Sequence, residues 1–560
     1  MISNVVWLRI GLCFGLLGSL VAGQLPAARA QSDPAGFDTV INAPPTIIGA
    51  DDSIGSNTQL NVFDDEDVEV EVGTGFNLGS ASGDSTNVEL NLFSGVVDST
   101  VRSGFSANFG STTNILGGSL GSTAEANSGS VVNISGGTVG TQFRARTGSV
   151  VNISGGTVGY LFDAVGGSVV NVSGGSVGPN FDAFAGSELN VSGGTFGGGF
   201  EAFPGSNVTF IGGEFLLNGE PPTDPASVTL SGSDVLTGTL QDGSVFVFSS
   251  RDDLSGVTLQ TGTLPANNVL PIVVGSALDA PPTGLRAGQS LTLRGDGALG
   301  PDFAAVDATL NIEGGSMASN VEVVSSTVTI SDGVVPNLTA FSGSEINVSG
   351  GDVANVWLFE SSAEISGVAL DFLQVGFGSV VDFTDGTVGP DQGDNRGFGL
   401  PHLIVDADST VNISGGRFGI VNVLQDGEFN LFVTEAFIDG APIEGLSPGE
   451  TRTISERGQQ LLSGVLADGS EFLYLLNPLP LAVVGDTFDL GSTVTVTLAP
   501  AVPEVILGDV NQDAAVNFED IPSFIEVLQA GIFLPAADCN QDGEVNFEDI
   551  PVFIEILQAQ

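Results

Sequence analysis

The sequence contains no lysine, and its basic residues are twelve arginines set against 66 acidic residues. The formal net charge at pH 7 is −54. Proteins that bind nucleic acid through its phosphates need clustered Lys and Arg, so this composition excludes nucleic acid as a partner. A cationic partner or bound Ca²⁺ suits the charge better. A simpler interpretation is that a strongly negative surface keeps a β-rich protein dispersed.

Cysteine and histidine are also scarce. Cys13 lies in a predicted leader, so Cys539 is left alone and an intrachain disulfide is excluded. His402 is the single histidine, and the acidic pair Asp252-Asp253 stands without a cluster of basic residues, unlike a polysaccharide-lyase site. No GxSxG motif is placed on a strand-to-helix turn, as a nucleophile elbow requires. The sequence therefore predicts that the protein is not an enzyme.

Long apolar runs are confined to the N-terminus. Residues 1–30 contain Arg9, an apolar stretch and Ala28-Arg29-Ala30 before Gln31, which is the pattern of a secretory signal peptide. The stretch is too short to span a bilayer core of about 30 Å. We expect a mature chain without a transmembrane segment, located outside the cell or at its surface.

What the sequence has in abundance is a 19-residue repeat, of which one unit reads GSVVNISGGTVGTQFRART. Three pieces of alternating apolar and polar residues, SVVNIS, GTVG and QFRA, are bounded by Gly, which predicts strands and not helix. The repeated Asn positions are Asn114, Asn133, Asn152, Asn171 and Asn190.

A unit of this size cannot bury its own apolar face, so successive units must stack. In-register stacking places Val132 over Val151 and Phe143 over Phe162, with coils about 4.8 Å apart. The sequence therefore predicts a mainly β fold, a β-solenoid, with a right-handed parallel β-helix favoured. Outward Asn side chains are expected to hydrogen-bond along the stack.

A second array follows with looser spacing. Its centres are separated by 18, 18, 17, 18 and then 30 residues. Both arrays begin near an APPT segment, at 43–46 and 280–283, and end with a similar β-rich stretch, which indicates a tandem duplication. We expect two solenoid modules with β-rich caps, at 31–265 and 266–500, followed by a C-terminal module at 501–560.

The last and longest step of the second array holds about twelve extra residues. Insertions in solenoids map to loops on one face, so this is the best position in the array for a specific site. The alternative is an irregular loop between coils. The polar residues there are Asp391, Asp394, Arg396 and His402.

The C-terminal segment contains two twelve-residue stretches, DVNQDAAVNFED and DCNQDGEVNFED, each followed by an apolar segment with Pro in its first turn. Oxygen-bearing side chains occupy positions 1, 3, 5, 9 and 12, and position 7 offers its carbonyl. Ca²⁺ takes six to eight oxygen ligands, and this spacing wraps one ion. The predicted ligands are Asp509, Asn511, Asp513, Ala515, Asn517 and Asp520 in the first loop, and Asp538, Asn540, Asp542, Glu544, Asn546 and Asp549 in the second.

These loops resemble type I dockerin modules, especially the C-terminal dockerin-type segments of planctomycete-like secreted proteins. The resemblance implies two Ca²⁺ sites, each followed by a helix, and a partner that is cohesin-like or another envelope protein. Two departures stand out: Ala514 replaces the expected Gly at position 6 of the first loop, and Phe518-Glu519 and Phe547-Glu548 replace the hydroxyl pair of cellulosomal dockerins. The remainder resembles repetitive bacterial β-helix surface proteins.

The sequence thus predicts a secreted structural or adhesive repeat protein, attached or assembled through a calcium-binding module. The alternative is a polysaccharide-binding or polysaccharide-processing β-helix recruited by the same module. Beyond the leader the chain holds one Trp, Trp357, and two Tyr, which is little material for stacking on sugars.

Overall fold

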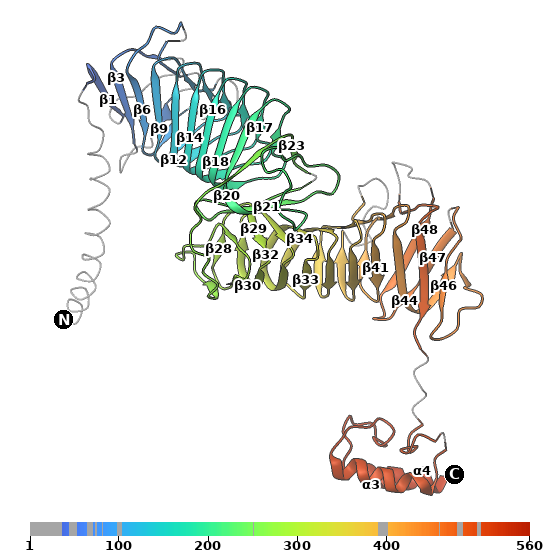
Figure 1. Cartoon of the computed structure of the whole chain (residues 1–560). Coiled ribbons are helices and arrows are strands. Elements are labelled where there is room, and N and C mark those ends of the chain that lie inside the picture. The colour runs from blue at the N-terminus through green and yellow to red at the C-terminus, as the bar shows by residue number, and fades with distance from the viewer. Residues whose placement is uncertain are drawn as a thin grey trace, which may run out of the picture. The chain divides into compact units, whose positions relative to one another are not determined.

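The computed structural model describes residues 36–43, 53–63, 71–72, 76–80, 82–97, 104–249, 251–389, 401–458, 460–478, 485–500, 506–513 and 515–559 (Figure 1). The predicted signal peptide, 1–30, lies outside these residues. The chain forms two compact units: the smaller comprises Glu444–Arg452 and Thr497–Gln560, and the larger the rest. No helix in the described part of the chain is long and apolar enough to cross a membrane.

The fold of the larger unit is a β-solenoid, as predicted. Its first parallel sheet stacks one strand per coil, in the order β1-β3-β6-β9-β12-β14-β16-β18-β20. These strands are β1 (Thr39–Ala43), β3 (Thr58–Val62), β6 (Val88–Leu92), β9 (Ser111–Ile115), β12 (Val131–Val139), β14 (Val150–Val158), β16 (Val169–Val177), β18 (Glu188–Phe196) and β20 (Asn207–Leu217). Four strands pair beside them: β4 (Glu71–Val72), β7 (Val96–Val97), β10 (Ser119–Leu120) and β24 (Thr258–Thr261).

A second sheet of short strands runs along the same coils. It consists of β2 (Ser53–Ile54), β5 (Asn77–Leu78), β8 (Ser106–Ala107), β11 (Glu125–Ala126), β13 (Arg144–Ala145), β15 (Asp163–Ala164), β17 (Asp182–Ala183), β19 (Glu201–Ala202) and β23 (Asp253–Leu254). The antiparallel strands β21 (Leu236–Leu240) and β22 (Val245–Phe248) pair onto the end of the first sheet, where Gly212 of β20 lies opposite Leu240.

The 19-residue register is confirmed. Val132 pairs with Val151, and Ile134 with Ile153. The Phe143 and Phe162 rings stack with centroids 5.1 Å apart, and the rings of Phe162 and Phe181 with centroids 4.5 Å apart. These side chains are buried and fill the space between the sheets, because alternate residues of each strand point inward.

The SVVNIS and GTVG pieces, expected as separate strands, form one strand in each of four coils. The register shifts between Ile134 and Thr138, where the SGG sequence bends the strand. A Cβ on Gly155 would lie 2.5 Å from the carbonyl oxygen of Ser135 in the preceding coil, and Gly156 has a φ of +73°. Only glycine therefore allows the coils to approach this closely while the strand continues.

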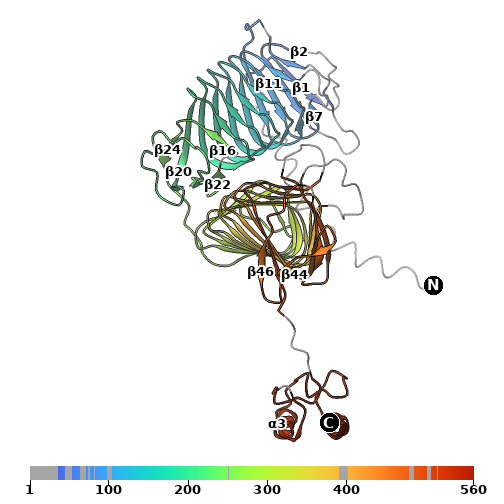
Figure 2. The same ribbon diagram turned by 90° about the vertical axis from the view of Figure 1, so that its right-hand side faces the viewer.

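Residues from Ile272 onward form a further run of stacked strands, whose coils superpose when viewed along the stack (Figure 2). Its large sheet comprises β25 (Ile272–Val274), β26 (Gly284–Leu285), β27 (Ser290–Leu293), β28 (Ala298–Leu299), β29 (Phe303–Val306), β30 (Thr309–Met317), β31 (Asn320–Val324), β32 (Thr327–Phe341), β33 (Glu345–Val348), β34 (Asp352–Phe359), β35 (Ser362–Ile365), β37 (Phe372–Gly376), β38 (Val380–Phe383), β40 (Leu403–Val405), β41 (Thr410–Ile413), β43 (Val421–Val423), β44 (Glu428–Ile438), β45 (Ala441–Pro442), β46 (Thr451–Thr453), β47 (Gln460–Leu466), β48 (Glu471–Leu476), β49 (Thr487–Phe488) and β50 (Thr493–Leu498). Three short strands form a separate sheet: β36 (Val368–Leu370), β39 (Gly386–Val388) and β42 (Arg417–Phe418).

The two runs of coils contact each other through a buried guanidinium. Arg286 donates from Nε to Glu214 Oε2 at 3.0 Å and from Nη2 to Glu214 Oε1 at 2.6 Å. The Arg286 side chain is 8% exposed, and its hydrogen bonds lower the pKa of Glu214. A bidentate pair of this kind is directional, so it fixes the register of the contact. A second arginine, Arg251, also reaches from the first run to the second, and its guanidinium lies over the Trp357 ring, 5.1 Å from the ring centroid.

The smaller unit contains the two predicted helices. A 3₁₀ turn, η1 (Phe518–Asp520), leads into α3 (Ile521–Ala530), and α4 (Asp549–Ala559) follows the second loop. The two helices pack through Phe524 and Phe553, whose rings stack with centroids 4.0 Å apart. The buried part of this core is small, and it is completed by Val510, Ala537 and Cys539.

Candidate metal centre

The first loop of the smaller unit folds around its own side-chain oxygens. The main-chain N–H of Asp513 donates to Asp509 Oδ1 and to Asn511 Oδ1, each at 3.0 Å. The N–H of Ala515 donates to Asp513 Oδ1 at 2.9 Å. These Asx turns curl the backbone of the loop around positions 1, 3 and 5.

Asp520, at position 12, closes this loop. Its Oδ1 accepts from the N–H of Asn511 at 3.0 Å, and its Oδ2 accepts from the N–H of Asn517 at 2.8 Å. Asn517 in turn accepts from the N–H of Glu519, which forms a capping box at the start of η1. The Asp520 carboxylate is fully buried. One side chain thus ties the beginning of the loop to the first turn of the helix.

The second loop repeats the pattern bond for bond. Asp542 N–H donates to Asp538 Oδ1 at 3.1 Å and to Asn540 Oδ1 at 2.9 Å, and Glu544 N–H donates to Asp542 Oδ1 at 3.0 Å. Asp549 accepts from the N–H groups of Asn540 and Asn546, at 3.1 and 2.8 Å, and is also fully buried. In both loops, main-chain N–H groups thus link the side chains at positions 1, 3, 5 and 12.

The C-terminal segment of this unit contains no cationic side chain. Residues 501–560 contain twelve Asp and Glu residues and no Lys, Arg or His. Asp520 and Asp549 are fully buried, and Asp538 is 6% exposed. Buried carboxylates without a cationic partner are costly, and a divalent cation removes that cost. The donor set is all oxygen, which fits Ca²⁺.

No three His, Cys, Asp or Glu side chains converge as metal ligands in the part of the chain that the structure describes. The three Asp ligands predicted for each loop, at positions 1, 5 and 12, therefore do not form such a group here, and Asp513 and Asp542 are exposed. Ala514, at position 6 of the first loop, lies outside the described residues. At the same position of the second loop, Gly543 has a φ of +89°, which suits glycine.

Cys539 belongs to the core of this unit and not to its loop ligands. Its side chain is 4% exposed, and its Sγ donates to the carbonyl oxygen of Ala536 at 3.8 Å. Burial, together with Asp549 and Asp538, raises the pKa of the thiol to about 11. A thiol that stays protonated is a poor ligand for Zn²⁺, so the chemistry of the site remains that of oxygen.

The other candidate region is the insertion of the second array, and His402 is the one residue of its four predicted polar residues that the structure describes. Asp391, Asp394 and Arg396 lie outside the described residues. His402 accepts from the N–H of Ile420 at its Nδ1, at 3.0 Å, and burial lowers its pKa. A Cβ on Gly389 would lie 2.3 Å from His402 Cγ, so the ring packs directly on that backbone. His402 has a structural hydrogen bond here.

Asp252, one residue of the Asp252-Asp253 pair, also has a structural role: its carboxylate binds main-chain N–H groups. Its Oδ1 accepts from the N–H groups of Gly199 and Phe200, both at 2.9 Å, and its Oδ2 accepts from Ser249 N–H at 2.8 Å. Burial raises its pKa to about 6, although these hydrogen bonds act in the opposite direction. The carboxylate holds the end of the first run of coils together.

The expected Asn ladder is confirmed and is longer than the sequence indicated. Asn133 Nδ2 donates to Asn114 Oδ1 at 2.8 Å, and Asn152 Nδ2 to Asn133 Oδ1 at 2.8 Å. Three residues outside the 19-residue repeat extend the ladder at its N-terminal side: Asn42, Asn61 and Asn91. Their spacings of 19, 30 and 23 residues hide the register, and only the shared pattern of apolar residues flanking Asn could have identified them.

No protein-family model, no curated protein and no solved structure matches the chain. Its function is therefore inferred from the chemistry of its own residues.

Proposed function

We propose that this is a secreted structural or adhesive repeat protein, assembled or attached at the cell surface through a dockerin-like module at 501–560 that binds two Ca²⁺ ions. Two tandem solenoid modules, at 31–265 and 266–500, form its body. The observation that carries the proposal is the pair of loops with one hydrogen-bond pattern, each closed by a buried carboxylate, in a segment without a cationic side chain.

Calcium supplies the missing positive charge. Each ion takes its ligands from Asp at positions 1, 5 and 12, Asn at positions 3 and 9, and the carbonyl at position 7. The buried core of the unit is small, and segments of this length commonly depend on a metal for stability. Metal binding and folding of the module are therefore coupled, and Ca²⁺ outside the cell favours the folded form.

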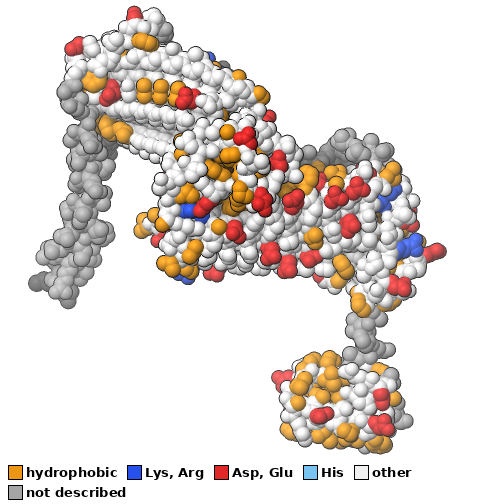
Figure 3. All heavy atoms as spheres, viewed as in Figure 1, with side chains coloured by type: hydrophobic (Ala, Val, Ile, Leu, Met, Phe, Trp, Pro, Cys, Tyr) orange, Lys and Arg blue, Asp and Glu red, His pale blue; other side chains and the backbone are white. Residues whose placement is uncertain are grey.

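Exposed apolar side chains on the module support a docking role. Phe518 and Phe547, at the same position of the two loops, are 76% and 80% exposed, and Ile525 and Ile554 of the helices are 46% and 45% exposed. Figure 3 shows hydrophobic side chains spread over the outside of this unit. Exposed aromatic residues of this kind commonly act as anchors in protein interfaces. We infer that the partner is a cohesin-like protein or another envelope protein.

The solenoid supports a structural role. Its coils are joined by parallel strand pairing, by a buried Phe column and by an Asn ladder, and such stacks extend in one dimension without a large single core. A polysaccharide-binding role, recruited by the same module, is the second candidate. It is favoured by a groove on the first run of coils, which is treated separately below.

The test uses the chain expressed without residues 1–30. Equilibrium dialysis against Ca²⁺ is expected to give two bound ions per chain, and the immobilised chain is expected to retain an envelope protein with Ca²⁺ and to release it in EGTA. The double variant Asp520→Asn/Asp549→Asn should lose both properties, because it removes the carboxylate that closes each loop.

The matched control is Glu526→Gln/Glu555→Gln, which removes two exposed carboxylates of the same unit. It should bind both ions and keep the partner. A chain that binds no Ca²⁺, or a control that fails like the loop variant, contradicts the calcium module. A chain that binds two ions and retains no partner contradicts docking and leaves the loops as a metal-stabilised terminus.

A further inference from the structure

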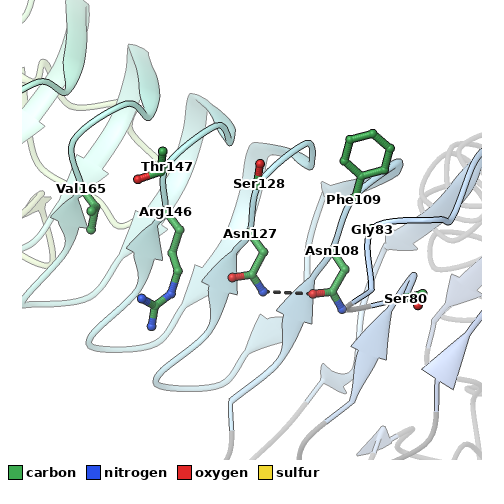
Figure 4. Close-up of a pocket in the computed structure, with 9 residues that line it drawn as sticks. All are labelled: Ser80, Gly83, Asn108, Phe109, Asn127, Ser128, Arg146, Thr147 and Val165. Carbon is green, nitrogen blue, oxygen red and sulfur yellow. Dashed lines mark hydrogen bonds between the residues drawn. The ribbon is translucent and has the colours of Figure 1, made fainter.

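A groove of about 510 Å³ crosses successive coils of the first run (Figure 4). Its volume would suit a short ligand. It is well separated in sequence from the calcium loops. Figure 4 shows that its residues come from one position in each of several coils and from the next position along the chain. The lining residues are Ser80, Gly83, Asn108, Phe109, Asn127, Ser128, Arg146, Thr147 and Val165.

One row of the groove carries planar polar groups. Asn127 Nδ2 donates to Asn108 Oδ1 at 3.1 Å, and Arg146 follows 19 residues later where another Asn would continue the ladder. The short ladder therefore ends at Asn127 Oδ1, which has no protein partner among the described residues. Arg146 donates to Glu125 from Nη2, and the guanidinium has further donors for which the described chain offers no acceptor.

The neighbouring row adds an aromatic face and hydroxyl groups. Phe109 is 45% exposed, and a Cβ on Gly129 would lie 2.2 Å from its Cδ2, so the ring rests on the backbone of the next coil. The other side of the ring is accessible. Ser128 and Thr147 follow in the next two coils, and both are exposed. An apolar surface beside a few fixed polar groups is typical of small-molecule sites.

The charge of the groove is balanced. The Arg146 guanidinium is paired with Glu125, and Arg144 Nε donates to Asp163 Oδ2 at 2.8 Å in the same sheet. The whole chain is strongly negative, which repels an anionic polymer. The groove therefore offers directional hydrogen bonds and an aromatic face without net charge of either sign, a combination that suits a ligand rich in hydroxyl groups and free of charge.

We propose that this groove binds a segment of a neutral polysaccharide that runs along the stack of coils. Asn127 Oδ1 accepts from a sugar hydroxyl, Arg146 and Ser128 donate to sugar oxygens, and the Phe109 ring packs against the C–H face of one sugar ring. Successive coils lie about 4.8 Å apart, so an extended chain meets the side chains of a new coil at each step. This role goes beyond the proposed assembly function and does not depend on it.

The experiment uses the chain without residues 1–30, and isothermal titration with five neutral hexasaccharides: cellohexaose, xylohexaose, mannohexaose, laminarihexaose and chitohexaose. Hexagalacturonate serves as the anionic comparison. At least one neutral probe is expected to bind. Phe109→Ala and Arg146→Ala should each weaken that binding tenfold or more, with the thermal midpoint of the solenoid measured to confirm that each variant is folded.

Two matched controls lie on the same solenoid and outside the groove. Tyr160→Ala removes another exposed aromatic side chain, 50% exposed, and Arg144→Ala removes the other ion-paired arginine. Both should change the affinity less than twofold. The proposal is overturned if no neutral probe binds, if only hexagalacturonate binds, or if the controls weaken binding as much as the groove variants.

Repeating the titration in EGTA separates this site from the calcium module. Binding of the neutral probe should persist when the loops are empty, because the groove lies on the solenoid. Loss of sugar binding in EGTA would contradict an independent groove. A failed groove with two Ca²⁺ still bound would leave the proposed function intact.

Discussion

Asp182 is a partly buried carboxylate in a row of carboxylates stacked in successive coils. Asp163, Asp182 and Glu201 pair in register on β15, β17 and β19. Partial burial, followed by the charges of Glu201 and Asp163, raises the pKa of Asp182 to about 6 from the ordinary value of 3.8. The ionised form is therefore less stable in the folded protein than in the unfolded chain.

The sign of the pH dependence follows from linkage. Between pH 3.8 and 6 the folded state binds the Asp182 proton more tightly than the unfolded chain does, so the stability of the solenoid falls as pH rises through this window. Asp182→Asn removes the titration. We expect the variant to melt about 1–2 °C above the parent at pH 8, since the charge is partly exposed, and to match it near pH 4.

Asp163→Asn is the control for this prediction. Asp163 belongs to the same row, but it accepts from Arg144, so its carboxylate is compensated. Its substitution should not stabilise the solenoid at pH 8. Differential scanning calorimetry at pH 4, 6 and 8 measures both variants. Equal effects of the two substitutions would contradict the burial of an uncompensated carboxylate at Asp182 as the main cause of the raised pKa.

At the scale of the element, the Asn ladder joins the coils from outside the core. Asn152 takes part in two bonds: its Nδ2 donates to Asn133 Oδ1 at 2.8 Å, and its Oδ1 accepts from Asn171 Nδ2 at 2.9 Å. Asn152→Ala leaves one donor and one acceptor without partners. We expect a loss of about 1–3 kcal/mol in the free energy of unfolding of the first run of coils, measured by urea denaturation.

Thr157→Ala provides the comparison on the same strand, β14. Thr157 is exposed, and the described chain gives its hydroxyl no partner. Its substitution should change the unfolding free energy by less than about 0.5 kcal/mol. A ladder variant that behaves like Thr157→Ala would show that strand pairing and the Phe column carry the stack without help from the amides.

The sequence predicted the stacked elements where equivalent residues of successive coils keep a constant spacing. It did not predict them where that spacing varies. The 19-residue period gave the stacking of Val132 on Val151, because equal coil lengths keep the register visible. Coils of unequal length carry Asn61 and Asn91 into the same ladder, and no period marks them. The loop ligands could be predicted because their spacing is local to twelve residues. The pairing of Arg286 with Glu214, separated by 72 residues, depends on how distant coils meet, which local pattern does not encode.

At the scale of the whole molecule, the two compact units differ in what stabilises them. The larger unit is held by strand pairing and a continuous apolar interior. The smaller unit has a core of a few residues, and its buried carboxylates are costly unless a cation compensates their charge. The two units should therefore respond differently to removal of Ca²⁺.

We expect EGTA to unfold the smaller unit and to leave the larger one folded. The helical circular-dichroism signal of α3 and α4 should fall, while the β signal and the thermal midpoint of the solenoid remain unchanged. Limited proteolysis in EGTA should then degrade residues 501–560 first and release an intact solenoid, whereas added Ca²⁺ should protect both units, because a bound ion shifts the equilibrium toward the folded loops.

Glu526→Gln/Glu555→Gln separates calcium binding from a general effect of negative charge. This control removes two negative charges from the smaller unit without changing a predicted loop ligand. If it protects the unit in EGTA as well as Ca²⁺ does, repulsion among surface carboxylates explains the instability. If it stays as sensitive as the parent chain, the instability comes from Asp520, Asp549 and the other buried ligands, because only a cation inside each loop compensates a carboxylate that solvent cannot reach.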